Sequence, residues 1–193
     1  MNEYISILLA GLLTENMVLA KFLGICSFLG VSKKINTAFS MSVAVTLVMV
    51  LASAVTYPVY SYLLIPYSLE YLQTVVFILI IAALVQLIEI ILKKFLPAVY
   101  KAFGIYLPLI TTNCAILGIT ILNFTNQRID CFAKALVNAL GAGLGFMLAM
   151  LLFSGVRKKL ETCNIPKALE GLPITLIAAA IVSLSFMGFA GIV

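Results

Sequence analysis

The sequence predicts an all-α integral membrane protein with six transmembrane helices arranged as a 3+3 inverted repeat. Three observations support this prediction: the composition, six long apolar runs, and a short cysteine pattern that occurs twice. Of the 193 residues, 64% are hydrophobic and only 10% are charged. A soluble domain carries about 25% charged residues, so this chain lacks the polar surface that water requires. We therefore expect one membrane domain over residues 1–193, surrounded by a lipid bilayer.

The apolar runs are long enough to cross a membrane as helices. Roughly 20 helical residues cover the hydrocarbon core, and continuously apolar runs argue against the alternating strands of a barrel. The connections are short and hold most of the charge. The expected spans are 4–31, 37–64, 71–92, 103–123, 132–153 and 173–193.

The basic residues are divided unevenly between the two sides of such a bundle. The connections after spans 1, 3 and 5 hold most of them, whereas the other side holds only Arg128 and Lys134. Because basic residues favour the cytoplasmic side, both termini are expected on the outer face. The residues on the expected cytoplasmic side are Lys33, Lys34, Lys93, Lys94, Lys101, Arg157, Lys158, Lys159 and Lys167.

Polar residues interrupt the first run, which is too long for one straight crossing. The segment 14–16 (Thr-Glu-Asn) is followed by Lys21 and Gly24, just before Cys26. Irregular backbone survives in a bilayer only where protein or a polar cavity covers it, so we expect two half-helices that meet near the midplane. Glu15 is expected to cap the second half-helix, since an acid stabilises a helix N-terminus. A role of Glu15 in ion handling or in supporting the loop is the alternative.

Span 4 shows a similar pattern. Pro108 and the segment 111–113 (Thr-Thr-Asn) precede Cys114. Both Cys26 and Cys114 open a Cys-x-x-Leu-Gly pattern. Span 4 is therefore also expected to be discontinuous, although ordinary helices with a few polar packing residues remain the alternative for both spans.

Each half of the chain holds three spans, in repeat units of roughly 1–96 and 97–193. An odd number of crossings inverts the second unit relative to the first, around an axis in the membrane plane. Such an axis brings equivalent residues together only near the midplane. In span 5, Gly141 and Gly145 form a GxxxG pair that is expected to admit another helix closely.

The two repeated thiols, Cys26 and Cys114, are candidate metal ligands, because thiolates are soft ligands. The alternative is that both are small apolar packing residues. The chain has no histidine, which excludes His-ligated haem and mixed Cys/His zinc sites. Cys131 and Cys163 are expected about a membrane thickness apart, so they cannot both join one site. A [2Fe–2S] cluster takes four ligands, so the residues predict either no cluster or one shared with a second chain.

The chain resembles the A subunits of the Rnf ion-translocating electron-transport complexes, which are ferredoxin:NAD oxidoreductases. The resemblance runs from end to end, and it also extends to the E subunits of the sodium-translocating NADH:quinone oxidoreductases. The residues that carry it include Asn16-Met-Val-Leu, Lys21-Phe-Leu-Gly-Ile-Cys26, Gly104-Ile-Tyr-Leu-Pro-Leu-Ile-Thr-Thr-Asn-Cys114 and Phe186-Met-Gly-Phe-Ala-Gly191.

The resemblance implies a [2Fe–2S] cluster within the membrane, held by Cys26, Cys114 and two cysteines of a homologous, inverted partner, the E subunit of the complex. Gly24, Thr112, Asn113 and Glu15 are the candidate supporting residues. Thr112 and Asn113 are expected to donate hydrogen bonds to sulfur, as are the backbone amides at the breaks.

The resemblance also implies a place in a larger assembly. The B, C, D and G subunits would carry flavin and iron–sulfur centres in a bacterial inner membrane, with electron flow coupled to Na⁺ or H⁺ movement. This chain would be one component of a redox-driven ion translocase, without a complete active site of its own and without a nucleic-acid partner. A small inverted-repeat transporter or channel without a redox centre is the alternative.

Overall fold

The computed structural model describes residues 2–32, 35–67, 70–95, 107–126, 129, 131–160, 162–163, 166 and 170–188. Within these ranges the chain forms helices joined by turns, without a strand, which confirms the all-α prediction. Several basic residues used to predict the orientation lie outside the described ranges, so the orientation stays a prediction. They are Lys33, Lys34, Lys101, Arg128 and Lys167.

The helical segments follow one another closely along the chain. They are α1 (Asn2–Leu9), the π-helix η1 (Ala10–Thr14), α2 (Ile25–Val31), α3 (Ile35–Val59), the π-helix η2 (Tyr60–Leu64), the 3₁₀-helix η3 (Glu70–Leu72), α4 (Gln73–Phe95), α6 (Leu107–Thr111), α7 (Cys114–Thr125), α8 (Phe132–Leu160) and α9 (Leu172–Met187). By length and composition, four stretches of the described chain are able to cross a membrane: Ile35–Leu64, Gln73–Ile91, Pro108–Thr125 and Phe132–Leu160. The helix over Glu3–Thr14 and α9 are shorter apolar helices.

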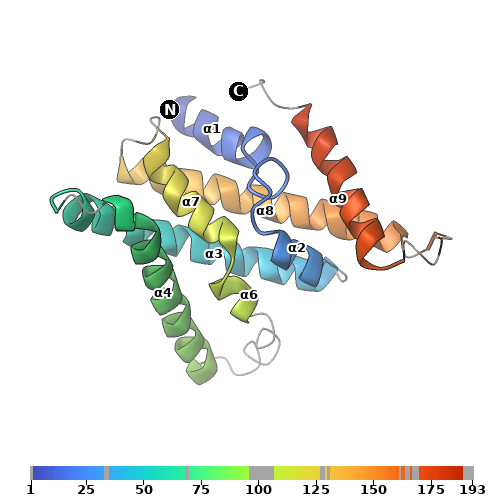
Figure 1. Cartoon of the computed structure of the whole chain (residues 1–193), viewed down its shortest axis with the longest axis horizontal. Helices are drawn as coiled ribbons and strands as arrows, with labels where there is room; N and C mark the ends of the chain where they lie inside the picture. Colours follow the sequence, from blue (N-terminus) through green and yellow to red (C-terminus); the bar gives the residue numbers. More distant parts are fainter. Residues whose placement is uncertain are drawn as a thin grey trace.

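Helices α3 and α8 lie side by side along the middle of the molecule (Figure 1). The buried residues of α3 recur every three or four positions, as in Met41, Val45 and Val48, so one face of the helix meets the core. Small residues allow close packing, and a Cβ added at Gly143 of α8 would lie 2.5 Å from the Thr46 side chain. This pair is the scaffold on which the other segments are placed.

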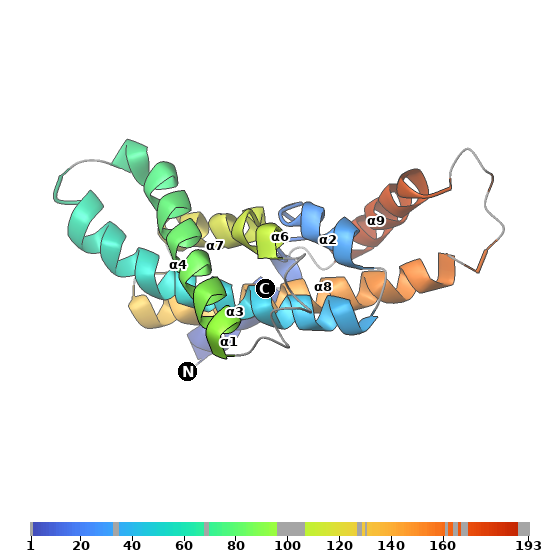
Figure 2. The same cartoon turned by 90° about the horizontal axis from the view of Figure 1, so that it is seen from below.

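Helices α4 and α9 extend away from opposite ends of the α3–α8 pair (Figure 2). α4 is the least buried of the four long stretches, with 17% of its apolar window inside the protein. Its exposed side carries large apolar residues, including Ile78, Leu79, Leu87 and Ile90. A helix this apolar on its outer face is suited to lipid or to a neighbouring protein chain.

The small residues of α8 admit the first helix closely, which confirms the expectation for the GxxxG pair. A Cβ at Gly145 would lie 2.7 Å from the carbonyl oxygen of Gly11 in η1, and one at Gly141 would lie 2.9 Å from that of Leu8. Backbones in such contact leave no room for a side chain, so both positions require glycine.

The observed helix ends differ from the predicted spans at the C-terminal end of span 5. The prediction ended this span at residue 153, but α8 continues to Leu160. Its 29 residues give a length of about 43 Å at 1.5 Å per residue, which exceeds the hydrocarbon thickness. The difference arises because Arg157, Lys158 and Lys159 were assigned to a loop on charge alone, whereas basic residues are also favourable in the last turn of a helix.

Candidate metal site at the helix breaks

The first break lies between Thr14, where η1 ends, and Ile25, where α2 begins. Asn16 organises it: the side-chain oxygen accepts hydrogen bonds from the N–H groups of Val18 (3.0 Å) and Leu19 (3.3 Å). The Asn16 amide nitrogen donates to the Gly145 carbonyl oxygen on α8 (2.8 Å). Asn16 is fully buried, so these bonds satisfy a polar group that would otherwise be costly.

The end of the first break depends on left-handed backbone. Phe22 has φ 58° and Gly24 has φ 84°, a region in which glycine is the residue without penalty. A Cβ at Gly24 would lie 3.1 Å from the Ala115 Cβ and 3.2 Å from the side-chain oxygen of Asn113. Position 24 therefore requires glycine for two reasons: its backbone is left-handed, and the second break leaves little room for a side chain.

The second break is shorter and consists of Thr112 and Asn113, between α6 and α7. The Asn113 side-chain oxygen accepts from the Ala115 N–H (3.1 Å) and caps α7. Its amide nitrogen donates to the hydroxyl of Ser27 on α2 (3.3 Å). The Thr112 hydroxyl donates to the Pro108 carbonyl oxygen (2.7 Å), which closes the last turn of α6.

The two breaks bring together the thiols of Cys26 and Cys114. Cys26 is the second residue of α2 and Cys114 is the first residue of α7. The Gly24 N–H donates to the Cys114 sulfur (2.9 Å), and the two thiols are close enough to interact with each other. Both thiols lie in the first turn of a helix.

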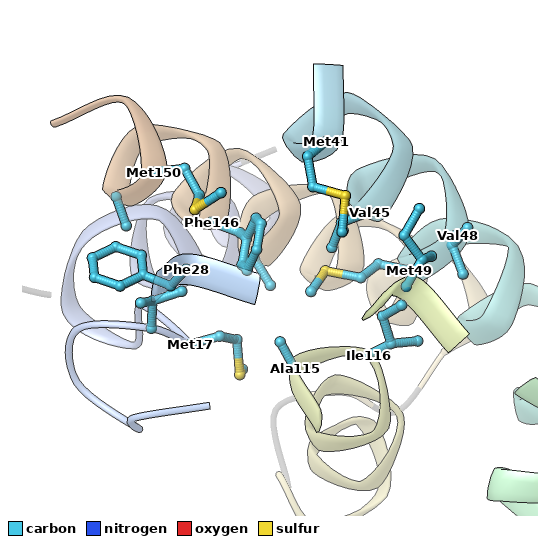
Figure 3. Close-up of a cluster of buried hydrophobic side chains, with 14 of the residues drawn as sticks. Met17, Phe28, Met41, Val45, Val48, Met49, Ala115, Ile116, Phe146 and Met150 are labelled. Carbon is cyan, nitrogen blue, oxygen red and sulfur yellow. The ribbon is translucent and has the colours of Figure 1, made fainter. Parts of the chain in front are cut away.

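Apolar side chains fill the space behind the breaks. Met17 and Phe28 from the first half of the site face Ala115 of α7 and Phe146 of α8 (Figure 3). Phe28 also stacks on Phe153 of α8, with ring centroids 4.2 Å apart. This packing joins the two breaks to each other and to α8.

The opposite side of the site is open. Cys26 is exposed and Cys114 is half-buried. A pocket of about 340 Å³ runs beside Cys114, between α4 and the α6–α7 junction. Among the described residues, no third His, Cys, Asp or Glu joins the two thiols. Within the part of the chain that the structure covers, the site thus offers two thiols as candidate ligands, of which Cys26 is exposed.

Cys131 and Cys163 lie away from this site. They are found just beyond the two ends of α8, and both are exposed. The length of α8 separates them by about 43 Å, in agreement with the separation expected from the sequence. They serve as natural controls for the pair at the breaks.

The structure corrects the expected role of Glu15. It does not cap α2, whose N-terminal flanking residue is Gly24 and has no side-chain cap. Glu15 instead ends η1, with its N–H donating to the Ala10 carbonyl oxygen (2.7 Å). The capping of the first break falls to the neighbouring Asn16, because a carboxamide offers both an acceptor and a donor to the surrounding backbone.

Thr112 and Asn113 also differ from the expectation that they donate to sulfur. Their side-chain donors bond to Pro108 and Ser27, so they shape the break. The described N–H donor to the Cys114 sulfur is the Gly24 backbone amide. The sequence pointed to Gly24 as a supporting residue but not to its contact with the other half of the chain.

Arg157 was missed as a site residue, because it was counted with the basic residues of a loop. Its side chain is buried (9% exposed) and donates to the Leu29 carbonyl oxygen (2.7 Å) and the Ser32 hydroxyl (2.9 Å). These contacts tie the C-terminal end of α2 to α8, so Arg157 positions the short helix that carries Cys26.

Comparison with known proteins gives consistent results over the whole chain. A family model described as "Rnf-Nqr subunit, membrane protein" matches residues 4–193. The chain is 55% identical to the A subunit of the Na(+)-translocating ferredoxin:NAD(+) oxidoreductase complex of Acetobacterium woodii, over 97% of this chain and 96% of that protein. It is 51% identical to the A subunit of the ion-translocating oxidoreductase complex of Syntrophotalea carbinolica, over 100% of this chain and 99% of that one. A third relative, the corresponding A subunit of Azoarcus sp., is 47% identical over 100% and 98% of the two chains.

Proposed function

Because the chain belongs to the Rnf–Nqr family of membrane subunits, we propose that it supplies half of a [2Fe–2S] centre in an ion-translocating oxidoreductase complex. The centre relays electrons across the membrane, and the relay is coupled to Na⁺ or H⁺ transport. The relatives' names support the kind of complex. The chemistry of the site supports the kind of centre.

The meeting of Cys26 and Cys114 is the observation that carries this function. They come from segments 88 positions apart, yet the Gly24 amide that precedes Cys26 bonds to the Cys114 sulfur. Two thiols with an N–H aimed at sulfur suit an iron–sulfur centre. Since such a cluster takes four ligands, the open face at Cys26 is where a partner supplies the other two.

The fold supports the same function. We infer that α1–η1 with α2 forms one broken span, and that α6 with α7 forms the second. With α3, α4, α8 and α9 these make six spans in a 3+3 inverted repeat. Helix termini that meet inside a bundle are a known way to build a site at mid-depth. The long helices α3 and α8, which occupy matching places in the two units, cross the centre together.

The residues of this chain have separable tasks in the relay. Cys26 and Cys114 would bind the iron of the cluster. The Gly24 N–H would stabilise negative charge on the Cys114 sulfur, which raises the reduction potential of the cluster. Met17, Phe28 and Phe146 exclude water on the inner side. When bound, the cluster takes up and releases one electron. An electron carrier at mid-depth divides electron transfer across ~30 Å of hydrocarbon into two shorter steps.

The remaining ligands are proposed to come from a homologous partner with inverted topology, the E subunit. The B, C, D and G subunits would carry the flavin and iron–sulfur centres on either side. In this assembly the chain lies in a bacterial inner membrane with both termini on the outer face, as the basic residues predict.

The test uses the purified complex with its partner chains. After reduction, the visible absorption and EPR spectra are expected to show a [2Fe–2S] centre. Cys26→Ser and Cys114→Ser should each remove that signal, because each removes an iron ligand. Cys131→Ser and Cys163→Ser are the matched controls and should leave it intact.

A colourless, EPR-silent preparation with all subunits present would contradict the proposal and favour a transporter component without a redox centre. Loss of the signal in all four variants would also contradict the assignment, since it would mean that the thiols at the breaks are not special.

A further inference from the structure

A small polar pocket lies apart from the cysteine site, between the first helix and the turn that joins α7 to α8. Its volume is about 10 Å³, which is room for a single water or ion. The polar side chains in its lining come from Glu15, Asn126 and Asn138, and its apolar lining includes Gly11 and Ile129.

Glu15 is the acidic residue in the lining of this pocket. The residue is half-buried, and its backbone N–H is already bonded to Ala10. Among the described residues, no side chain donates to the Glu15 carboxylate or pairs with it. The Lys134 side chain forms an ion pair with Glu3 (2.6 Å). A carboxylate within a membrane protein is costly unless its charge is compensated.

The side-chain oxygen of Asn138 accepts no hydrogen bond from the described residues. The Asn138 amide nitrogen donates to the side-chain oxygen of Asn123 (2.9 Å), and the Asn123 amide nitrogen donates to the Ser53 hydroxyl (3.2 Å). These bonds link Asn138 of α8, through Asn123 of α7, to Ser53 of α3. Because Asn138 also lines the pocket, its side-chain oxygen is available as a ligand there.

We propose that this pocket is a binding site for a sodium ion, with Glu15 as the charged ligand and Asn138 as a neutral oxygen ligand. A single carboxylate balances one monovalent cation, whereas a divalent ion would leave an uncompensated charge in a region of low dielectric. Carboxylate and amide oxygens are hard ligands of the kind that hard cations prefer. A cavity the size of one water matches one dehydrated sodium ion.

The site's position gives it a role in transport, a step that rests on the function proposed above. The pocket adjoins the turn after α7, which faces outward in the predicted topology. The polar row Asn138–Asn123–Ser53 leads from it into the core. Sodium would enter or leave at this outer end, away from the thiols.

Carbodiimide labelling of the purified complex tests binding directly. Dicyclohexylcarbodiimide modifies carboxyl groups within membrane proteins, and sodium bound to the same group prevents this. We expect labelling of Glu15, read by peptide mass spectrometry in sodium-free potassium buffer. By mass action, sodium at ten times its Kd should slow that labelling about tenfold.

The variant Asn138→Leu keeps the volume but removes the neutral ligand, so labelling should persist while sodium protection is lost. Equal labelling rates in sodium and potassium would overturn the site. So would undiminished protection in Asn138→Leu, or a complete lack of labelling in sodium-free buffer. This readout does not depend on the cluster, so it stands or falls separately from the redox function.

Transport by the assembled complex in membrane vesicles gives the second measurement. Glu15→Gln is expected to abolish sodium uptake while the cluster signal remains. Glu3→Gln, a matched acid-to-amide change on the same helix, should transport normally. Normal sodium uptake by Glu15→Gln would contradict the proposal. If Glu15→Gln fails to assemble, the labelling of the unmodified complex decides.

Discussion

The two helix breaks use the same cap but reach their cysteines by different backbones. Asn16 and Asn113 each accept a hydrogen bond from the N–H two residues ahead, at 3.0 Å and 3.1 Å. After Asn113, α7 and Cys114 follow at once. After Asn16, the chain makes an extra turn with left-handed geometry at Phe22 and Gly24 before α2 begins.

The extra turn accounts for the difference between the two thiols. It brings the Gly24 N–H within hydrogen-bonding distance of the Cys114 sulfur, and it leaves Cys26 exposed. The second break has one bond to a distant residue, from Asn113 to Ser27 of α2, whereas the first depends on two anchors from α8, at Gly145 and Arg157. The two sequence patterns are similar, but the first break depends on more contacts with distant residues. We therefore expect mutations in the first break to be more damaging.

The largest difference is expected between Gly24→Val and Thr112→Ala, which change matching positions of the two breaks. Gly24→Val places a branched side chain at φ 84° against Ala115 and Asn113, at a cost of about 4 kcal/mol from conformation and overpacking together. Thr112→Ala removes one exposed hydrogen bond and should cost about 0.5 kcal/mol. Thermal unfolding of the purified complex measures both. Equal losses of stability in the two variants would show that the first break does not require glycine at position 24.

The two asparagine caps give a smaller contrast. Asn16→Ala removes the acceptor of the buried Val18 and Leu19 N–H groups and should cost about 3 kcal/mol. Asn113→Ala removes the cap of α7 and the bond to Ser27 and should cost about 2 kcal/mol. Denaturant unfolding compares the two variants. A larger loss of stability in Asn113→Ala than in Asn16→Ala would contradict the view that the first break is the more vulnerable one.

Arg157→Met tests whether the first break needs its anchor at the end of α2. The loss of two charged hydrogen bonds should cost about 2 kcal/mol and broaden the EPR signal, because α2 and Cys26 become less ordered. The neighbouring exposed Lys158 provides a control as Lys158→Met. If both variants behave like the unmodified complex, α2 is positioned by other contacts.

The smallest effect is expected at the outer end of α1, away from both breaks. Hydrogen bonding and charge from Lys134 hold the pKa of the Glu3 carboxyl below its ordinary value of 4.5. The Glu3–Lys134 ion pair is therefore fully formed above the ordinary pKa, and it is lost as the pH falls through the lowered pKa of Glu3. Because Glu3 is exposed, Glu3→Gln should leave the Tm unchanged at neutral pH, and a clear drop would show that this end supports the breaks.

The sequence predicted the helical class, the two glycines of α8 and the two cysteine-bearing segments, because these depend on composition and on spacing along one helix. It misassigned Glu15, since both Glu15 and Asn16 suit a helix end and only the fold decides between them. The contact of Gly24 with Cys114 joins segments from different halves of the chain, and no local pattern specifies it. Arg157 looked like a loop residue because its charge alone was considered, while its burial depends on the C-terminal end of α2.

The iron content of the assembled complex tests most directly whether both thiols serve one shared centre. Cys26→Ser and Cys114→Ser should each lose the same two iron atoms of a [2Fe–2S] cluster, relative to Cys131→Ser. The double variant Cys26→Ser/Cys114→Ser is expected to lose no more iron than either single variant. Additive losses in the double variant, or full iron content in either single variant, would contradict a single cluster held between the two breaks.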